Sequence, residues 1–285
     1  MNIAFVVLTY NRSDALLAVL RALAPQCGAQ DEVVIADDGS RPEHVDAIRA
    51  GLPAFACPVR HVWIPDTGFT AARSRNLGAA HSRADYLVFL DGDCVPAPRF
   101  AEMHARLAQA GHFVNGSRVL LSETFTQRVL GGGLELGKLR PRDWLWLRAR
   151  AEVNKLTHLF PWPDAPLRVE ERFHWKGIRS CNFGVWRRDL EAVDGFDDTF
   201  SGWGHEDADL VLRLHHAGLR RKNGFLATEV FHLWHRENPR ERENVNRDRV
   251  RARMRSGIVR AEAGLSGALH ASDTVVTELN FPQRD

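Results

Sequence analysis

The chain has 285 residues, of which 44% are hydrophobic and 26% charged, and this ordinary globular balance excludes a mostly disordered protein. Its 38 basic and 36 acidic residues leave a net charge of +2. Because nucleic-acid binders are usually strongly basic, we expect no nucleic-acid partner.

The start of the chain predicts neither a membrane span nor a signal peptide. The first apolar run, residues 3–8, is far shorter than the roughly 20 residues that cross a bilayer, and no basic residue precedes it. The four cysteines contain no C-x-x-C pair, which argues against a zinc site and a disulfide framework. We expect a reduced, cytoplasmic protein, with peripheral contact at the inner face of a membrane left open.

Short apolar runs alternate with helical patterns in the N-terminal part. Continuous apolar runs of this length are typical of strands covered on both faces. A first helix is expected after Ser13 or Asp14, which can cap it. The alternation predicts an α/β fold, a mostly parallel sheet with helices on both faces. The predicted strands are residues 3–8, 32–36, 59–64 and 86–90, and further helices are expected at residues 43–50 and 70–81.

Polar clusters follow three of these strands, at residues 9–12, 37–40 and 91–93. In parallel sheets, ligands bind at the carboxyl ends of the strands. We therefore expect the three clusters to converge on one crevice.

The rest of the chain is less regular. Residues 117–178 show no clear β-α-β repeat and are predicted to be an insertion of helices and loops. Seven of the eight tryptophans lie from Trp144 onward, and we expect core packing for most of them, with a sugar- or membrane-facing surface as the alternative. After Pro239, arginines alternate with acids, which is typical of a solvated helix face or, alternatively, of a segment that binds phosphates or anionic lipid.

We expect residues 1–285 to form a single domain of four parts. Its parts are a nucleotide-sugar half at 1–116, the insertion at 117–178, an acceptor-binding half at 179–238 and a basic tail at 239–285.

The clearest sign of chemistry is Asp91-Gly92-Asp93, directly after the predicted strand 86–90. Side chains two apart on an extended chain point to one face, so both carboxylates can reach one cation. Hard oxygen ligands suit Mg²⁺ or Mn²⁺, and Mn²⁺ more readily adds an imidazole. A structural turn is the alternative, since turns after strands often contain Asp and Gly.

Two later segments carry complementary groups. Residues 203–209 place a tryptophan beside three acids, which suits gripping a sugar and deprotonating its hydroxyl. Acids at a helix start, favoured by the helix dipole, are the simpler interpretation. His232 and His235 follow the strand-like residues 227–231, and either is a candidate metal ligand.

Taken together, these motifs resemble family 2 glycosyltransferases of the GT-A fold. The C-terminal motifs are similar to those of β-1,4-galactosyltransferases and bacterial chondroitin-type polymerases. The resemblance covers about residues 2–238, apart from 117–178, and implies a Rossmann-like GT-A sheet; the charge pattern after Pro239 predicts a helical tail behind it. The matching segments are residues 7–12, 37–40, 72–78, 89–93, 180–184, 195–197 and 203–209.

The resemblance also implies a donor site and a metal site. Mn²⁺ or Mg²⁺ would be held by Asp93, with Asp91 beside it, and by His235, or by His232 as the second choice. The nucleotide-sugar donor, with UDP the first expectation and dTDP and GDP open, would contact Thr9, Tyr10, Asn11, Arg12, Asp38, Asp66, Gly68, Arg73, Asn76 and Asp91.

The implied reaction is an inverting transfer of the sugar to a hydroxyl of a glycan or lipid-linked glycan, as in cell-surface polysaccharide synthesis. Asp207 would be the catalytic base and Glu206 a ligand of the acceptor hydroxyl, with Trp203 and Gly204 at the acceptor. His205 stands where the related motif often has glycine.

Two other functions remain open at this point. A nucleotidyltransferase shares the fold and the carboxylates, although the glycine-free loop after the first strand argues against it. A non-catalytic glycan-binding protein of the same fold is the second alternative, although it would need no base beside a metal site.

Overall fold

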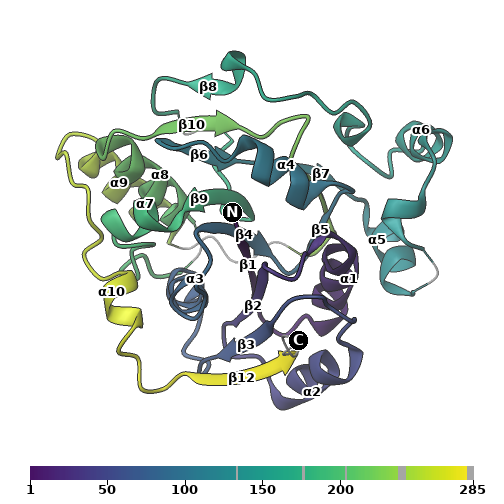
Figure 1. The fold of residues 1–285 in the computed structure, drawn as a ribbon, viewed down its shortest axis with the longest axis horizontal. Helices are drawn as coiled ribbons and strands as arrows, with labels where there is room; N and C mark the ends of the chain where they lie inside the picture. The colour runs from purple at the N-terminus through teal and green to yellow at the C-terminus, as the bar shows by residue number, and fades with distance from the viewer. Residues whose placement is uncertain (133, 175–176, 203, 237–241, 281–285) are drawn as a thin grey trace.

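The computed structural model describes residues 1–132, 134–174, 177–202, 204–236 and 242–280. A nine-stranded sheet crosses the molecule in the order β12-β3-β2-β1-β4-β9-β6-β10-β8 (Figure 1). Pairing is parallel from β3 to β4 and mixed elsewhere, since β12, β9 and β8 run antiparallel to their neighbours. The strands are β1 (Ile3–Thr9), β2 (Glu32–Asp37), β3 (Val59–Trp63), β4 (Tyr86–Asp91), β6 (His112–Asn115), β8 (Val169–Glu170), β9 (Asn182–Trp186), β10 (Arg220–Asn223) and β12 (Val275–Asn280).

The four predicted strands are confirmed to within one residue, and so is the α/β fold. Alternate side chains of β1 enter different cores, as the two-residue period of a strand requires. Phe5 and Val7 pack in the core beneath α1 (Ser13–Leu23), whereas Ala4 and Val6 pack in the core that includes α3 (Ala71–Ala80). The sheet is therefore buried on both faces, which explains its continuous apolar runs.

Helix α3 lies unusually close to the sheet because of one glycine. A Cβ at Gly78 would meet Cγ1 of Val6 at 2.5 Å. Because α3 lies this close to the sheet, its other side chains can reach the carboxyl ends of the strands. The remaining helices of the two halves are α2 (Pro42–Gly51), α4 (Phe100–Leu107), α7 (Arg187–Ala192) and α8 (Glu206–His216), with a short 3₁₀ turn η1 (Ala24–Gln26).

A second, three-stranded sheet lies beside the first and has the order β5-β11-β7. Its strands are β5 (Cys94–Pro96), β11 (Glu229–His232) and β7 (Ser117–Leu120). β11 runs antiparallel to β5 with His232 opposite Cys94. Two motifs more than 130 residues apart in the sequence are thereby placed side by side.

The region 117–178 is mostly helices and turns, as predicted, but two of its strands join the sheets. β7 belongs to the small sheet and β8 to the large one. In Figure 1, α5 and α6 lie together at one side of the molecule. The elements are α5 (Glu123–Leu130) and α6 (Pro141–Ala149), with 3₁₀ turns η2 (Leu136–Lys138), η3 (Thr157–Leu159) and η4 (Pro166–Arg168).

Only some of the tryptophans from Trp144 onward occupy the expected core positions. Trp144 is buried and stacks on Phe231 of β11, with ring centroids 4.7 Å apart. Trp146, Trp162 and Trp234 are instead between 42% and 53% exposed. For these three, the expectation of a core position is wrong.

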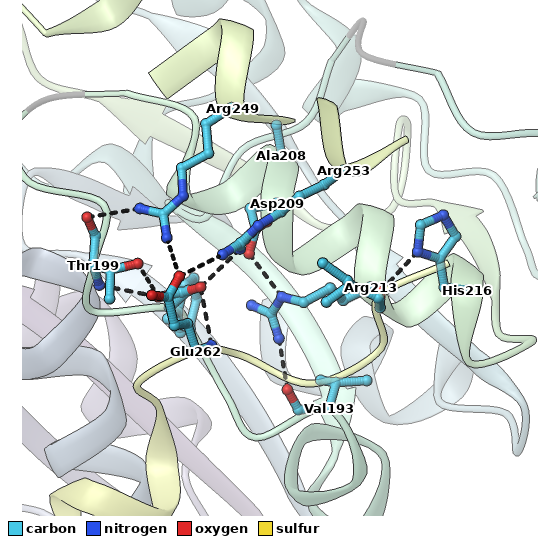
Figure 2. Close-up of polar contacts among 12 residues, drawn as sticks. Val193, Thr199, Ala208, Asp209, Arg213, His216, Arg249, Arg253 and Glu262 are labelled. Carbon is cyan, nitrogen blue, oxygen red and sulfur yellow. Dashed lines mark hydrogen bonds and ion pairs between the residues drawn. The ribbon is translucent and has the colours of Figure 1, made fainter. Parts of the chain in front are cut away.

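The C-terminal segment is part of the fold, and the expectation of a helical tail needs correction. It contains α9 (Glu243–Arg253) and α10 (Leu265–Ala268), but it ends in β12, which pairs with β3 at the edge of the large sheet. α9 is not a simple solvated face either. Arg253 is nearly buried and one of its nitrogens lies 2.7 Å from both Asp197 and Asp209, so it ties α9 to α8 (Figure 2).

Among the helices that the structure describes, none is both long and apolar enough to cross a membrane.

Candidate functional site

The polar clusters after β1, β2 and β4 meet at one edge of the sheet, as predicted. The Gly92 amide donates to the carbonyl of Leu8 at 2.7 Å, and the Asp38 amide donates to the carbonyl of Thr9 at 2.9 Å. The Asn11 amide donates to Oγ of Ser40 at 2.8 Å. These bonds hold the three strand ends together.

The side chains of Asp93, His232 and His235 lie together at this edge. Nε2 of His235 is 3.3 Å from Oδ2 of Asp93, and Nε2 of His232 is 3.9 Å from Oδ1. The two imidazole rings are 5.2 Å apart. Pairing of β11 with β5 produces this arrangement, and Cys94 adds a buried thiol within 4.8 Å of the ligand atoms of Asp93 and His232.

The side chains of His235 and Asp93 form a donor set that a cation would fit. Nδ1 of His235 lies 2.9 Å from the carbonyl of Arg236, which can only accept, so in a neutral ring Nδ1 would carry the proton. Nε2 then presents a lone pair to the carboxylate of Asp93, and two acceptors that face each other need a proton or a cation between them. Carboxylate and imidazole donors together suit Mn²⁺. Burial lowers the pKa of His232, which favours the neutral imidazole that binds metals.

Arg75 connects Asp91 of the Asp91-Gly92-Asp93 motif to Glu206 at the start of α8. It is 3% exposed, and its Nη2 lies 2.9 Å from Oδ1 of Asp91 while its Nη1 lies 3.3 Å from Oε1 of Glu206. Burial alone would lower the pKa of Arg75, but these two carboxylates outweigh it and the pKa is raised. Asp91 therefore faces a guanidinium, whereas Asp93 faces the histidines.

The sequence analysis missed Arg75, although its helical phase could have revealed it. Ala72 and Ala79 of α3 pack in the core between helix and sheet, and Arg75 falls on the same face, three residues after one and four before the other. An arginine on the buried face of a helix needs carboxylate partners, which the nearby strand end supplies.

Glu206 and Asp207 begin α8 and have different surroundings. Glu206 is 8% exposed, and its pKa is raised to about 7, mainly by burial and also by the charge of Asp207, against the opposing effect of Arg75. Asp207 is only partly buried, and one of its carboxylate oxygens accepts from the amide of Ala208 at 2.7 Å. The residue before them, His205, has a left-handed φ of 71°, the conformation that favours glycine. This explains why the related motif often has glycine there.

The third acid of this segment, Asp209, has a different position. It is completely buried between Arg213 and Arg253, each 2.7 Å away (Figure 2). Asp209 therefore anchors α8 to α9, and it is more deeply buried than Glu206 and Asp207, the first two acids of α8.

The residues expected around the nucleotide base form two groups. Tyr10 donates to Asp66 at 2.9 Å, and the Gly68 amide donates to the same carboxylate at 3.0 Å, which lowers the pKa of Asp66. Tyr10 is 47% exposed, so this group borders solvent. Asp38 is buried, which raises its pKa, and it accepts from the Thr70 amide at 3.0 Å and from Ser74 at 2.7 Å.

Other predicted donor residues are occupied by neighbours within the chain. Arg12 lies 3.0 Å from Asp14, and Arg73 lies 2.5 Å from Asp273. Asn76 is completely buried, and its amide group bonds with both backbone polar groups of Phe196. These contacts favour a structural role for Asn76, between α3 and the loop before α8.

Gly204 was predicted to lie at the acceptor, and its carbonyl accepts from Asn246 of α9 at 2.9 Å. Trp203, the predicted acceptor platform, lies outside the described residues.

Two family models match the chain. A family model described as "Glycosyl transferase family 2" matches residues 4–157, and one described as "N-terminal domain of galactosyltransferase" matches residues 167–236. The first match extends into the region 117–178, for which no family motif was apparent in the sequence.

Relatives and solved structures extend the similarity over most of the chain. Validoxylamine A glucosyltransferase of Streptomyces hygroscopicus subsp. jinggangensis is 28% identical over 84% of this chain, and chondroitin synthase of Escherichia coli is 24% identical over 86%. The chain spans 56% and 36% of these two relatives.

Two solved structures share the fold. They are a mannosyltransferase from Pyrobaculum calidifontis in complex with GDP-Man and Mn²⁺ (TM-score 0.55, 17% identity, 95% of this chain and 70% of that one) and the catalytic domain of Drosophila β-1,4-galactosyltransferase 7 (0.52, 14%, 93% and 83%). Since the family 2 model matches more than half of the residues, the chain is a family 2 glycosyltransferase with the GT-A fold.

Proposed function

We propose that the chain transfers a sugar from a nucleotide sugar to a hydroxyl group of a glycan or a lipid-linked glycan, with inversion at the anomeric carbon. The observation that carries this proposal is the meeting of two groups at one strand edge. Asp93 and the two histidines form a metal-ligand set, and Arg75 bridges Asp91 to Glu206 beside Asp207.

Asp93 and His235 would hold Mn²⁺ or Mg²⁺, with His232 as the second choice of histidine ligand. When bound there, the cation offsets the charge of the donor diphosphate. Arg75 adds a fixed positive charge on the other side of Asp91. The nucleotide base and ribose would lie toward Tyr10, Asp66 and Gly68.

Asp207 is the better base of the two neighbouring acids. It is partly exposed, whereas Glu206 is buried and engaged by Arg75. In the proposed step, the acceptor oxygen bonds to the anomeric carbon as the bond from that carbon to the diphosphate oxygen breaks. The hydroxyl proton passes to Asp207, and the nucleoside diphosphate leaves with the bonding electron pair. Placing donor and acceptor in line supplies much of the rate.

The donor nucleotide is proposed as UDP from the motifs, with GDP as the second choice because the mannosyltransferase neighbour holds GDP-Man. Chondroitin synthase among the relatives supports an acceptor in polysaccharide synthesis. The family match argues against the nucleotidyltransferase alternative.

A thermal-shift screen tests this proposal directly. UDP-, GDP- and dTDP-sugars are compared with and without Mn²⁺, because a ligand at about 100 times its Kd stabilises the native state by about 2.7 kcal/mol. We expect a metal-dependent rise in Tm with one nucleotide class. The rise should vanish in Asp93→Ala and persist in Glu191→Ala, an exposed acid on α7.

Two results would contradict the proposal. A shift that is the same with EDTA as with Mn²⁺ would remove the metal site. Binding of a sugar nucleotide without any transfer or hydrolysis, across a panel of glycan acceptors, would favour the non-catalytic alternative.

A further inference from the structure

One face of α6 is exposed in a way that the proposed reaction does not require. Trp144 and Leu147 point into the core and are 2% and 4% exposed. Leu145 and Trp146, between them in sequence, are 58% and 53% exposed. Large adjacent apolar side chains on a surface are a signal of contact with a partner or a membrane.

Strong positive charge surrounds these two apolar residues. Between residues 138 and 150 there are five basic residues and a single acid, Asp143. The guanidinium of Arg150 lies 4.6 Å from the centre of the Trp146 ring, and Arg142, which is 75% exposed, lies 3.8 Å from Asp143. We define the outer face of α6 as Arg142, Leu145, Trp146, Arg148 and Arg150.

This combination matches the chemistry of an anionic phospholipid surface. Tryptophan rings settle at the level of the headgroups, apolar side chains enter the acyl boundary, and arginines attract anionic phosphates. An apolar partner protein would account for Leu145 and Trp146 but not for the surrounding excess of positive charge. The charge therefore selects the lipid surface among the possible occupants.

The outer face is firmly connected to the candidate metal site. On the opposite side of α6, Trp144 stacks on Phe231, the residue before His232. Helix α5 makes a second connection, since Oγ1 of Thr126 accepts from the amide of Trp234 at 2.8 Å. Figure 1 shows α5 and α6 together at one side of the sheet. A surface bound by α6 would thus lie at a fixed position relative to β11.

We propose that the outer face of α6 docks the protein on an anionic phospholipid membrane. The benefit of docking rests on the proposed function, because it would present the site to an acceptor that is itself anchored in lipid. The docking itself does not depend on the reaction, so it is measured without donor or acceptor.

Vesicle co-sedimentation of the full chain tests the proposal. We expect binding to vesicles of phosphatidylcholine with phosphatidylglycerol, little binding to phosphatidylcholine alone, and release between roughly 0.1 and 1 M salt. Arg142→Gln with Arg148→Gln should weaken binding about 25-fold, or about fivefold for each arginine near an anionic surface. Leu145→Gln with Trp146→Gln should weaken it by roughly tenfold or more.

A matched control carries the same kinds of change elsewhere. Leu269→Gln with Arg83→Gln removes one exposed apolar residue directly after α10 and one exposed basic residue between α3 and β4, and it should bind as the wild type does. Equal Tm values for all variants would show that they fold alike.

Three outcomes would overturn the inference. The wild type binds neither vesicle, or it binds both equally, or both α6 variants bind like the control. Sedimentation velocity adds a fourth: an oligomer in the wild type that Leu145→Gln with Trp146→Gln dissociates would identify the face as a contact between copies. None of these results bears on the thermal shift with sugar nucleotides, so the two proposals fail separately.

Discussion

Replacing Glu206 with glutamine should stabilise the protein, and only above acidic pH. The pKa of Glu206 is raised from an ordinary 4.5 to about 7, first by burial and next by Asp207. Below about pH 4.5 the carboxyl group is protonated in both folded and unfolded chains and costs nothing. Between 4.5 and 7 the unfolded chain binds fewer protons than the folded one, so stability falls as pH rises. Above 7 the full cost, about 3 kcal/mol, is present.

The assay is urea unfolding of wild type and Glu206→Gln from pH 4 to pH 8. We expect nearly equal stability at the acidic end and an advantage for the variant of about 3 kcal/mol at the alkaline end. The comparison between the two chains cancels other groups that titrate in the same window, such as Asp198, whose pKa burial also raises to about 7.

Glu102 provides a control of opposite sign. It is exposed, and its hydrogen bond with Arg99 lowers its pKa to about 2. Above acidic pH, Glu102→Gln should therefore be no more stable than the wild type. If Glu206→Gln is the less stable chain at pH 8, attraction to Arg75 outweighs burial, and the reasoning about Glu206 is refuted.

Three further predictions follow from particular contacts. Asp207→Asn should keep donor affinity but lower the transfer rate by a factor of about 10² or more, and transfer near the wild-type rate would identify a different base. Arg253→Met should cost about 3–5 kcal/mol in urea unfolding, because it leaves two buried carboxylates without their shared partner, whereas the exposed Arg251→Met should stay within about 0.5 kcal/mol. Gly78→Ala should cost roughly 1–3 kcal/mol through its clash with Val6, and a gain in Tm would contradict that packing.

The parallel core of the sheet was predictable because local signals there agree with tertiary structure. β1, β2 and β4 are covered on both faces, so their sequences are apolar runs, and polar residues begin where these strands end. Convergence of the clusters at residues 9–12, 37–40 and 91–93 followed from topology alone.

The edges of the fold were not predictable by the same means. β12 is half-exposed and pairs with β3, more than 200 residues earlier, so its sequence carries no buried run. β8 has only two residues. The arginines of α9 read as a solvated face because nothing local reveals that Arg253 meets Asp197 and Asp209. Long-range ion pairs leave no periodicity in the sequence.

In the candidate site, too, local sequence features were predictable and long-range contacts were not. The motifs predicted the acids and histidines of the candidate site. A motif does not reveal which of its side chains face a ligand and which contact other residues of the protein. Asn76 lies inside the matching segment 72–78 and bonds with Phe196 and Asp198, whereas Arg75 beside it reaches the strand end. The helical phase of α3 separates the two, and only the structure supplies the partners that give the phase its meaning.

The bridge made by Arg75 suggests why two adjacent acids begin α8. Paired carboxylates take different roles when their surroundings separate their pKa values. Glu206 is buried, and its pKa of about 7 lets it hold a proton near neutral pH and donate a hydrogen bond to an acceptor oxygen. Asp207 is partly exposed and lies outside the contacts of Arg75 with Glu206 and Asp91, so it is the one placed to take a proton. Under the proposed function, Arg75 would serve both halves of the site, since it pairs with Asp91, the proposed donor residue, and with Glu206, the proposed acceptor residue.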